Sequence, residues 1–262
     1  MSPRPARKEL GQHFLVDQNL LGVIGRLAEL GPDDVVLEVG PGLGVLTSYL
    51  ADNAGKVHAV ELDRSLEAPL KEALTGRRNV DLHFGDALEL DLAALEPAPS
   101  KLVSNLPYNI ATPLVVESLD LLPAVRLWTV MVQREVADRF FAAPSTKAYG
   151  AVSVLVQLST ERTGFHPVSR TVFRPRPNVD SALVAFRRLP AARTLDRRRV
   201  KKIVAAAFAH RRKRLSNSLE LTGIATRDQA AAALEAIGRE PGVRAEELAP
   251  PEFVALAEAL DR

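Results

Sequence analysis

The sequence contains no cysteine. A disulfide framework, a thiolate metal site and a thiol nucleophile are therefore excluded. It also lacks any apolar run close to the roughly 20 residues that a helix needs to cross a bilayer. The basic, proline-rich start, Met1 to Lys8, has no apolar stretch behind it and is unlike a secretory signal. We expect a soluble, cytoplasmic protein with no membrane contact.

What the chain does have is an ordinary globular balance, with 47% hydrophobic and 25% charged residues over 262 positions. That is enough for one large domain or two smaller ones. The net charge is only +2, so the distribution of charge says more about partners than its sum. The five histidines show no spacing typical of metal ligands, and we expect no metal.

Strands and helices alternate over most of the chain. A helix is expected from Gln18 to Leu30, with Asp17 as its N-cap and Gly31 as its stop. Strands are expected at residues 35–39, 56–61, 80–84, 102–104, 127–132 and 181–186. This order is typical of parallel βαβ units with both faces of the sheet covered, and the last strand should extend the edge of the sheet. Residues 152–158 fit either a helix or a strand.

The pattern changes near residue 189. Beyond it, Val200 to Phe208 place apolar residues on one helical face, and Thr226 with Gln229 forms a capping box before an alanine-rich run. We therefore expect an α/β domain over residues 1–189 and a small all-helical domain over residues 190–262.

A glycine-rich turn, Glu38-Val39-Gly40-Pro41-Gly42-Leu43-Gly44, follows the first strand. Glycines let the backbone turn tightly and approach a ligand closely. The spacing is G-x-G-x-G and differs from the G-x-G-x-x-G of dinucleotide-binding turns. The Glu38 carboxylate suits a ligand with a positive amine, such as the methionine end of S-adenosylmethionine. The alternative is a tight turn with no ligand.

Two acids follow the next two strands. Glu61 stands where nucleotide-binding α/β folds accept hydrogen bonds from ribose hydroxyls, and Asp86 could accept from the amine of a cofactor adenine. The alternatives are a helix cap or solvated carboxylate for Glu61 and an ordinary turn for Asp86. Asp63 fits the cap role better than Glu61. Because ligands of open α/β sheets bind at the carboxyl ends of the strands, the three motifs together favour a cofactor site.

The tetrad Asn105-Leu106-Pro107-Tyr108 comes directly after the fourth strand. Asn and backbone carbonyls can accept hydrogen bonds from a ring amine while Tyr stacks on the ring. A nucleobase taken out of its stack is recognised in this way. The stiff segment Phe173-Arg174-Pro175-Arg176-Pro177 could be a structural loop, or it could present Phe173 to a stacked base.

A basic segment, Arg211-Arg212-Lys213-Arg214, follows the apolar helix face. From Arg187 to Arg214 only Asp196 opposes a long series of arginines and lysines. So positive a local field attracts phosphates. The alternative is a solvated basic helix.

In this order, the motifs resemble those of the bacterial small-subunit ribosomal RNA adenine dimethyltransferases of the KsgA type. The similarity covers nearly the whole chain and also includes Gly11-Gln12-His13-Phe14-Leu15, residues 173–182 and residues 211–217. It implies a Rossmann-like S-adenosylmethionine-dependent methyltransferase fold with a helical C-terminal domain. The implied reaction converts two adjacent adenosines near the 3′ end of small-subunit rRNA to dimethyladenosine during small-subunit biogenesis.

The resemblance also implies roles for single residues. Asn105 and the backbone of Leu106 and Pro107 would hold the target amine, and Tyr108 and Phe173 would sandwich the base. The implied cofactor-binding residues are His13, Leu15, Gly40, Gly42, Glu61, Asp86 and Asn105. The implied RNA-binding residues are Arg211, Arg212, Lys213 and Arg214. The implied partners are small-subunit rRNA and the immature small subunit, bound by a monomer. By position and charge, the arm around Arg4, Arg7 and Lys8 is a candidate cover for the cofactor site.

Three alternatives compete with this interpretation. A large-subunit rRNA adenine methyltransferase is disfavoured by Asn-Leu-Pro-Tyr-Asn-Ile and by residues 173–182. A non-catalytic rRNA-binding assembly factor is disfavoured by the intact cofactor and amine motifs, although binding could accompany catalysis. A dinucleotide-dependent oxidoreductase is disfavoured by the glycine spacing.

Overall fold

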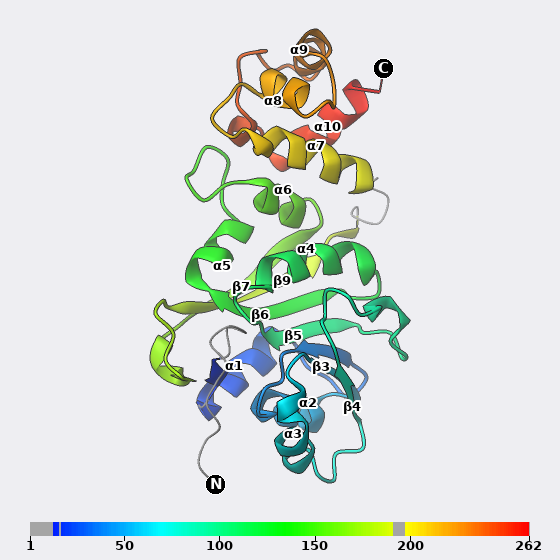
Figure 1. Cartoon of the computed structure of the whole chain (residues 1–262), viewed down its shortest axis with the longest axis vertical. Coiled ribbons are helices and arrows are strands. Elements are labelled where there is room, and N and C mark those ends of the chain that lie inside the picture. Colours follow the sequence, from blue (N-terminus) through cyan, green and yellow to red (C-terminus); the bar gives the residue numbers. More distant parts are fainter. Residues whose placement is uncertain (1–12, 16, 191–196, 262) are drawn as a thin grey trace. The chain divides into compact units, whose positions relative to one another are not determined.

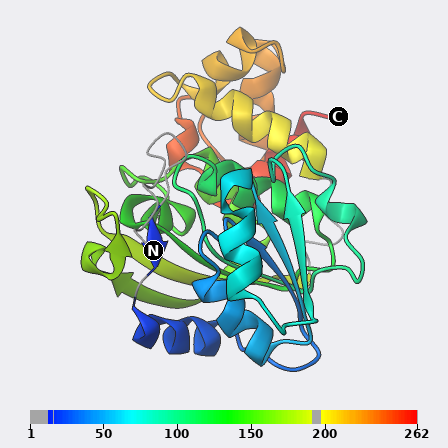
Figure 2. The ribbon, with the colours of Figure 1, turned by 60° about the horizontal axis from the view of Figure 1, so that its bottom comes forward.

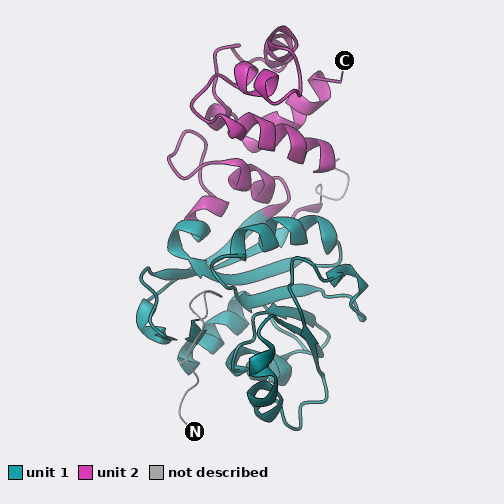
Figure 3. Cartoon of the chain, in the orientation of Figure 1, with its two compact units in different colours: residues 1–137, 161–188 teal, residues 138–160, 189–262 magenta. Residues whose placement is uncertain are grey.

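The computed structural model (Figure 1) describes residues 13–15, 17–190 and 197–261. They form two compact units (Figure 3). The first consists of the residues up to 137 together with 161–188, and the second consists of 138–160 together with the residues from 189 onward. The sequence predicts a single boundary, at residue 189. In the structure the second unit also includes residues 138–160, which interrupt the first unit along the chain. A periodic pattern shows where a helix begins but not which unit it packs on.

The first unit is built on a seven-stranded sheet of order β4-β3-β2-β5-β6-β9-β7. Its strands are β2 (Val35–Val39), β3 (Lys56–Glu61), β4 (Val80–Phe84), β5 (Lys101–Asn105), β6 (Leu127–Gln133), β7 (Thr160–Val168) and β9 (Ser181–Arg188). The pairs β3–β4, β2–β3, β2–β5 and β5–β6 are parallel, and β9 runs antiparallel to β6. The carboxyl ends of the central strands therefore meet at one edge.

Every strand expected from the sequence is present, and the parallel arrangement is confirmed. The expectation that the last strand forms the edge of the sheet is wrong, because β7 lies outside β9. The sequence did not predict β7, since most of its side chains are polar or exposed and an edge strand needs few apolar residues. The ambiguous residues 152–158 lie mainly in helix α6 (Ala151–Gln157).

Helices cover both faces of this sheet (Figures 1 and 2). On one face, α1 (Gln18–Leu27) and α2 (Val45–Asn53) bury apolar side chains in a shared core. That core includes Leu20, Ile24, Leu50, Val36, Val57, Val103 and Met131. On the other, α4 (Ala111–Leu121) is tied to β6 because Trp128 Nε1 donates to Ser118 Oγ at 2.9 Å. Helices α3 (Glu67–Ala73) and α5 (Arg134–Phe140) follow β3 and β6 along the chain.

Helix α1 shows how far a local pattern can be trusted. Asp17 caps it as predicted, accepting from the backbone amide of Asn19 at 2.8 Å. The helix ends at Leu27, earlier than expected, and Glu29 rather than Gly31 adopts a left-handed conformation, with φ of 49°. The end of a helix is set by such backbone geometry as well as by the apolar pattern.

A small two-stranded sheet pairs β1 (Phe14–Leu15) with β8 (Phe173–Arg174) in antiparallel register. Leu15 lies opposite Phe173, and both side chains are buried in the core on the α1 face. Segments near the two ends of the first unit's sequence are thereby joined.

The second unit is helical apart from the residue that begins β7. Its helices are α6, α7 (Arg197–Ala209), α8 (Leu215–Leu221), α9 (Arg227–Ala236) and α10 (Pro250–Ala259), with a short 3₁₀ turn at Ala245–Glu247. The predicted capping box is confirmed, since Thr226 and Gln229 exchange side chain–backbone hydrogen bonds. Tyr149 anchors the 138–160 segment, because its hydroxyl donates to the Leu248 carbonyl at 2.7 Å. In the described part of the chain, no helix combines the length and apolar character needed to span a membrane.

Candidate active site

A cavity of the first unit lies at the carboxyl ends of β2, β3, β4 and β5, beside β1. Sequence-predicted site residues line it: His13, Leu15, Gly40, Gly42, Glu61, Asp86, Asn105, Leu106, Pro107 and Tyr108. Glu38 lines it as well. The parallel sheet brings these residues together, because each motif follows a strand that ends at the same edge.

The glycine turn needs glycine for two reasons. Gly40, Gly42 and Gly44 have φ values of 77°, 60° and 80°, a region that side-chain-bearing residues rarely adopt. A Cβ on Gly40 would lie 3.1 Å from the Pro107 ring, and one on Gly42 would lie 2.9 Å from the Phe14 ring. The turn, the tetrad and β1 thus approach one another closely around the cavity.

Glu61 holds the glycine turn to the end of β3. Its Oε2 accepts from the Gly42 amide at 3.0 Å and its Oε1 from the Asp63 amide at 2.8 Å. Burial raises the pKa of this carboxyl, although these backbone donors act in the opposite direction. Each carboxylate oxygen can accept a second hydrogen bond, so a ligand hydroxyl could still be bound. The cap role belongs to Asp63 as predicted, since it accepts from the Ser65 amide at 3.0 Å.

Glu38 is the most strongly perturbed acid in the cavity. Its side chain is 1% exposed, and burial raises its pKa to about 8, with the charge of Glu61 adding to the effect. Among the described residues its Oε2 has no hydrogen-bond partner. A buried acceptor without a partner is costly unless a ligand supplies the donor. A ligand ammonium would both satisfy this oxygen and favour the ionised carboxylate.

Asp86 forms a turn and lines the cavity at the same time. Its Oδ1 accepts from the Leu88 amide at 2.9 Å, as a turn residue does. The same residue lines the cavity beside Gly85 and Ala87. The turn therefore orients the Asp86 carboxylate, which can still accept further hydrogen bonds from a ligand in the cavity.

Asn105 ends β5 and is fixed by His13, the residue before β1. Its Nδ2 donates to the His13 carbonyl at 3.0 Å, which assigns its Oδ1 as the acceptor for a ligand. The Pro107 carbonyl accepts from the amides of Ile110 and Ala111 at 3.2 and 3.1 Å, in the turn that begins α4. This turn uses the carbonyl of Pro107 and not that of Leu106.

Tyr108 is oriented by a residue from a distant strand. Its hydroxyl lies 2.6 Å from Ser181 Oγ at the start of β9, and burial raises the pKa of the phenol. Its ring centroid is 5.3 Å from that of His13, which in turn bonds through Nδ1 to the Pro175 carbonyl at 2.8 Å. Ser181 belongs to the motif at residues 173–182, but nothing in the sequence predicts its contact with Tyr108.

Phe173, which the resemblance implies as a partner of the target base, is buried in this structure. Its side chain is 1% exposed and packs in the core with Leu15 and Val168, because pairing of β8 with β1 turns it inward. Phe173 is absent from the cavity lining among the described residues. In this structure the ring that flanks Tyr108 is His13.

The basic segment of the second unit is heterogeneous. Arg211 donates through Nε to Glu246 at 2.8 Å and through Nη2 to the carbonyls of Thr146 and Lys147 at 3.2 and 3.1 Å. Arg212, Lys213 and Arg214 are exposed. A groove of this unit is lined by Ser145, Thr146, Lys147, Arg211, Arg212, Arg244 and Glu246. Arg4, Arg7, Lys8, Gly11, Gln12 and Asp196, used in the sequence argument, lie outside the described residues.

Comparisons with known proteins agree with this geometry. A family model described as ribosomal RNA adenine dimethylase matches residues 4–261. A Ribosomal RNA small subunit methyltransferase A of Rubrobacter xylanophilus is 49% identical over 97% of this chain and 95% of its own length.

Two solved structures are also similar. A dimethyladenosine transferase from Plasmodium falciparum superposes with a TM-score of 0.79 at 22% identity, covering 93% of this chain and 96% of that one. The 23S rRNA methyltransferase ErmE has a TM-score of 0.67 at 31% identity, covering 95% of this chain and 100% of that one. They confirm the Rossmann-like methyltransferase fold expected from the sequence. The chain belongs to the ribosomal RNA adenine dimethylase family.

Proposed function

We propose that this enzyme transfers methyl groups from S-adenosylmethionine to the exocyclic amines of two adjacent adenosines near the 3′ end of small-subunit rRNA. The observation that carries the proposal is one cavity in which Asn105 and Tyr108 meet Glu38, Glu61 and Asp86. Small-subunit RNA is favoured over large-subunit RNA because the relative named for the small subunit is 49% identical, against 31% for the 23S enzyme.

The residues of the cavity fit S-adenosylmethionine. The buried, unpartnered Oε2 of Glu38 would accept from the methionine ammonium. Glu61 would accept from the ribose hydroxyls and Asp86 from the adenine amine, while Gly40 and Gly42 allow the ligand to approach the backbone. His13 and Leu15 would close the cavity from β1. When bound, the cofactor supplies an electrophilic methyl group.

Asn105 and the tetrad backbone would prepare the nucleophile. The amine of adenine is a poor nucleophile because its lone pair is delocalised into the ring. Oδ1 of Asn105 and the carbonyl of Leu106 would accept the two amine protons, which favours a tetrahedral nitrogen with its lone pair directed at the methyl group. Pro107, whose ring leaves little room for a Cβ on Gly40, would fix the spacing of these acceptors. Catalysis would then come mainly from positioning, with no covalent intermediate.

Tyr108 would stack on the target base, held in orientation by Ser181. Phe173 would flank the other face of the base once its ring, buried here with Leu15, turns toward the cavity, and His13 borders Tyr108. A second transfer to each base requires that the cavity accept a monomethylated amine.

The exposed Arg212, Lys213 and Arg214 would contact rRNA phosphates. Arg211 would contribute by shaping the groove that it lines with Lys147 and Arg244. In this proposal a monomeric, cytoplasmic enzyme acts on the immature small subunit during its biogenesis.

The test is methyl transfer from labelled S-adenosylmethionine to purified small subunits that lack the modification, with large subunits as the control. We expect dimethyladenosine at two adjacent positions of the small-subunit RNA. Label on large subunits alone would contradict the proposed substrate. Cofactor binding without transfer to either particle would favour an assembly role. An inactive Asn105→Ala protein that still associates with immature subunits would support a binding role alongside catalysis.

A further inference from the structure

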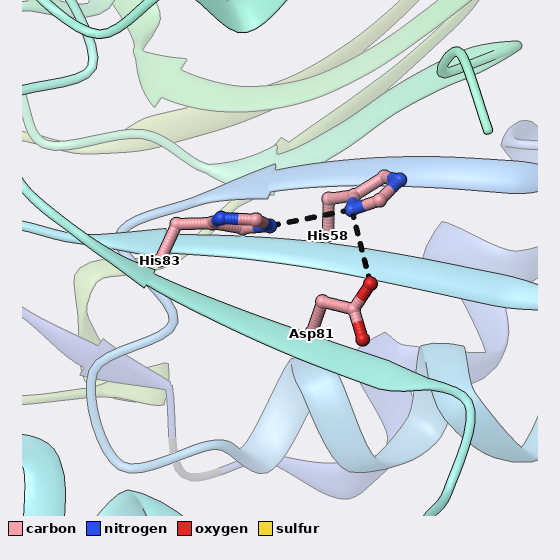
Figure 4. A group of neighbouring side chains, drawn as sticks. All are labelled: His58, Asp81 and His83. Atoms are coloured by element: carbon pink, nitrogen blue, oxygen red, sulfur yellow. Dashed lines mark hydrogen bonds and ion pairs between the residues drawn. The ribbon is translucent and has the colours of Figure 1, made fainter. Parts of the chain in front are cut away.

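Three potential metal ligands meet on the two outer strands β3 and β4 (Figure 4). His58 on β3 lies opposite Asp81 on β4, and His83 follows Asp81 by two residues. Alternate residues of a strand share a face, so the three side chains point to the same side of the sheet. Motif spacing along the chain does not reveal this group, because its ligands are brought together by strand register.

The distances within this group suit a tetrahedral ion. His58 Nδ1 is 3.3 Å from His83 Nε2 and 3.8 Å from Asp81 Oδ2, and one ligand atom from each residue lies within 4.8 Å of the others. Zn²⁺ binds nitrogen at about 2.0–2.1 Å, which at the tetrahedral angle separates two ligand atoms by roughly 3.3 Å. The two imidazole nitrogens already have this separation.

The surroundings orient the ligands. His58 Nε2 lies 3.0 Å from the Pro97 carbonyl, which can only accept, so Nε2 carries the proton and Nδ1 presents a lone pair to the group. A metal-binding histidine usually has its second nitrogen fixed in this manner. Lys56 pairs with Asp81 Oδ1 at 2.7 Å and leaves Oδ2 on the His58 side.

The side chains of this group differ in their exposure to solvent, which bears on how an ion would reach them. His58 is 1% exposed, whereas the Asp81 side chain is 42% exposed. An ion could therefore enter from solvent at Asp81 and reach a largely desolvated imidazole. A hydrogen bond between the two imidazoles accounts for their 3.3 Å separation, whereas a bound ion would also use Asp81 Oδ2, the carboxylate oxygen on the His58 side.

We propose that His58, Asp81 and His83 form a Zn²⁺ site, with a water molecule as the fourth ligand. Two imidazoles and one carboxylate are a ligand set that zinc accepts. The ion would tie the edge strand β4 to β3. Because β4 leads directly into Gly85 and Asp86 of the active-site cavity, the site would brace that wall without touching the reacting atoms. This inference does not depend on the identity of the RNA substrate.

The test uses the full-length protein stripped of metal with a chelator. Titration with ZnCl₂ by calorimetry should show one equivalent bound, and Co²⁺ should give the intense visible absorption of a tetrahedral site. Thermal unfolding should shift upward with zinc, since an ion that binds only the folded state stabilises it. Hydrogen exchange should slow in β4.

Two variants keep the experiment decisive. His83→Ala and Asp81→Asn change partly exposed edge-strand residues, and each should weaken Zn²⁺ binding by at least about tenfold. His166→Ala removes an exposed histidine of β7 and should leave the affinity unchanged. Circular dichroism verifies that each variant is folded. Absence of stoichiometric zinc binding by the wild-type protein, or equal affinity in folded His83→Ala and wild type, would overturn the proposal.

Discussion

The candidate active-site cavity of the first unit and the basic segment of the second use charge in opposite ways. Glu38 and Glu61 are 1% and 5% exposed, and backbone amides hold Glu61 in place. Arg212, Lys213 and Arg214 are exposed to solvent. Buried charges act individually and shift in pKa, whereas exposed charges act together and are screened by salt. Single substitutions should therefore have large effects in the cavity and small ones in the basic segment.

Arg211 sharpens the comparison because it belongs to the basic segment in sequence but is held by hydrogen bonds within the second unit. Its bonds to Glu246 and to the Thr146 and Lys147 carbonyls tie a loop of the second unit to the end of α7. Position in a charge run thus does not decide whether a residue meets a ligand or supports the fold.

The largest effect is expected for Asn105→Ala. Removing a positioned polar group of the reacting centre costs about 10²- to 10³-fold in kcat, and here it would also remove the bond that fixes His13. Single-turnover transfer to modification-free small subunits measures it, with cofactor affinity determined separately. Asn53→Ala, at the exposed end of α2, serves as the matched control. Near-normal turnover by a folded Asn105→Ala protein would contradict the assigned role.

Glu38 should make cofactor binding and stability depend on pH. Its pKa of about 8 in the ligand-free protein lies above the unfolded value of 4.5, so between these pH values the folded state holds a proton that the unfolded state has released. Stability should therefore fall as pH rises through this window, by at most about 1.4 kcal/mol per pH unit. Urea unfolding at several pH values should show a flatter profile for Glu38→Gln, and exposed Glu72→Gln should retain the wild-type slope.

The same carboxyl should release a proton when the cofactor binds near pH 7, because a bound ammonium lowers its pKa. Calorimetry in buffers of different ionisation enthalpy measures that release. In Glu38→Gln it should disappear and affinity should drop by about tenfold or more, in line with removal of a charge-assisted hydrogen bond. If the variant released as many protons as the wild type, Glu38 would not be the group that meets the ammonium.

A smaller effect than that of Asn105→Ala is expected at Tyr108. Base stacking on an aromatic ring contributes about 1–3 kcal/mol, so Tyr108→Ala should lower kcat/KM by roughly 10- to 100-fold. Tyr108→Phe keeps the ring and removes only the bond to Ser181, so its kcat/KM should fall several-fold at most. Equal decreases in the two variants would show that the hydroxyl, and not the stacked face, matters.

The sequence predicted most of this cavity because its motifs are local and each follows a strand. Glu38, Glu61, Asp86 and Asn105 needed only the parallel order of the strands to be placed together. The contacts that the sequence missed are those between distant segments. Pairing of Leu15 with Phe173 places the Phe173 ring in the core, and register between β3 and β4 brings His58 beside Asp81.

The smallest effects per residue are expected for Arg212→Ala, Lys213→Ala and Arg214→Ala. Each should weaken small-subunit RNA binding by only a few-fold, and removal of one phosphate-binding charge should lower the slope of log affinity against log salt by about 1. Filter binding across a salt series measures both. Arg211→Ala should behave differently, lowering the unfolding midpoint of the protein because the Thr146–Lys147 loop is no longer anchored. If all four variants showed the same salt slope and the same stability, the division between supporting and phosphate-binding arginines would fail.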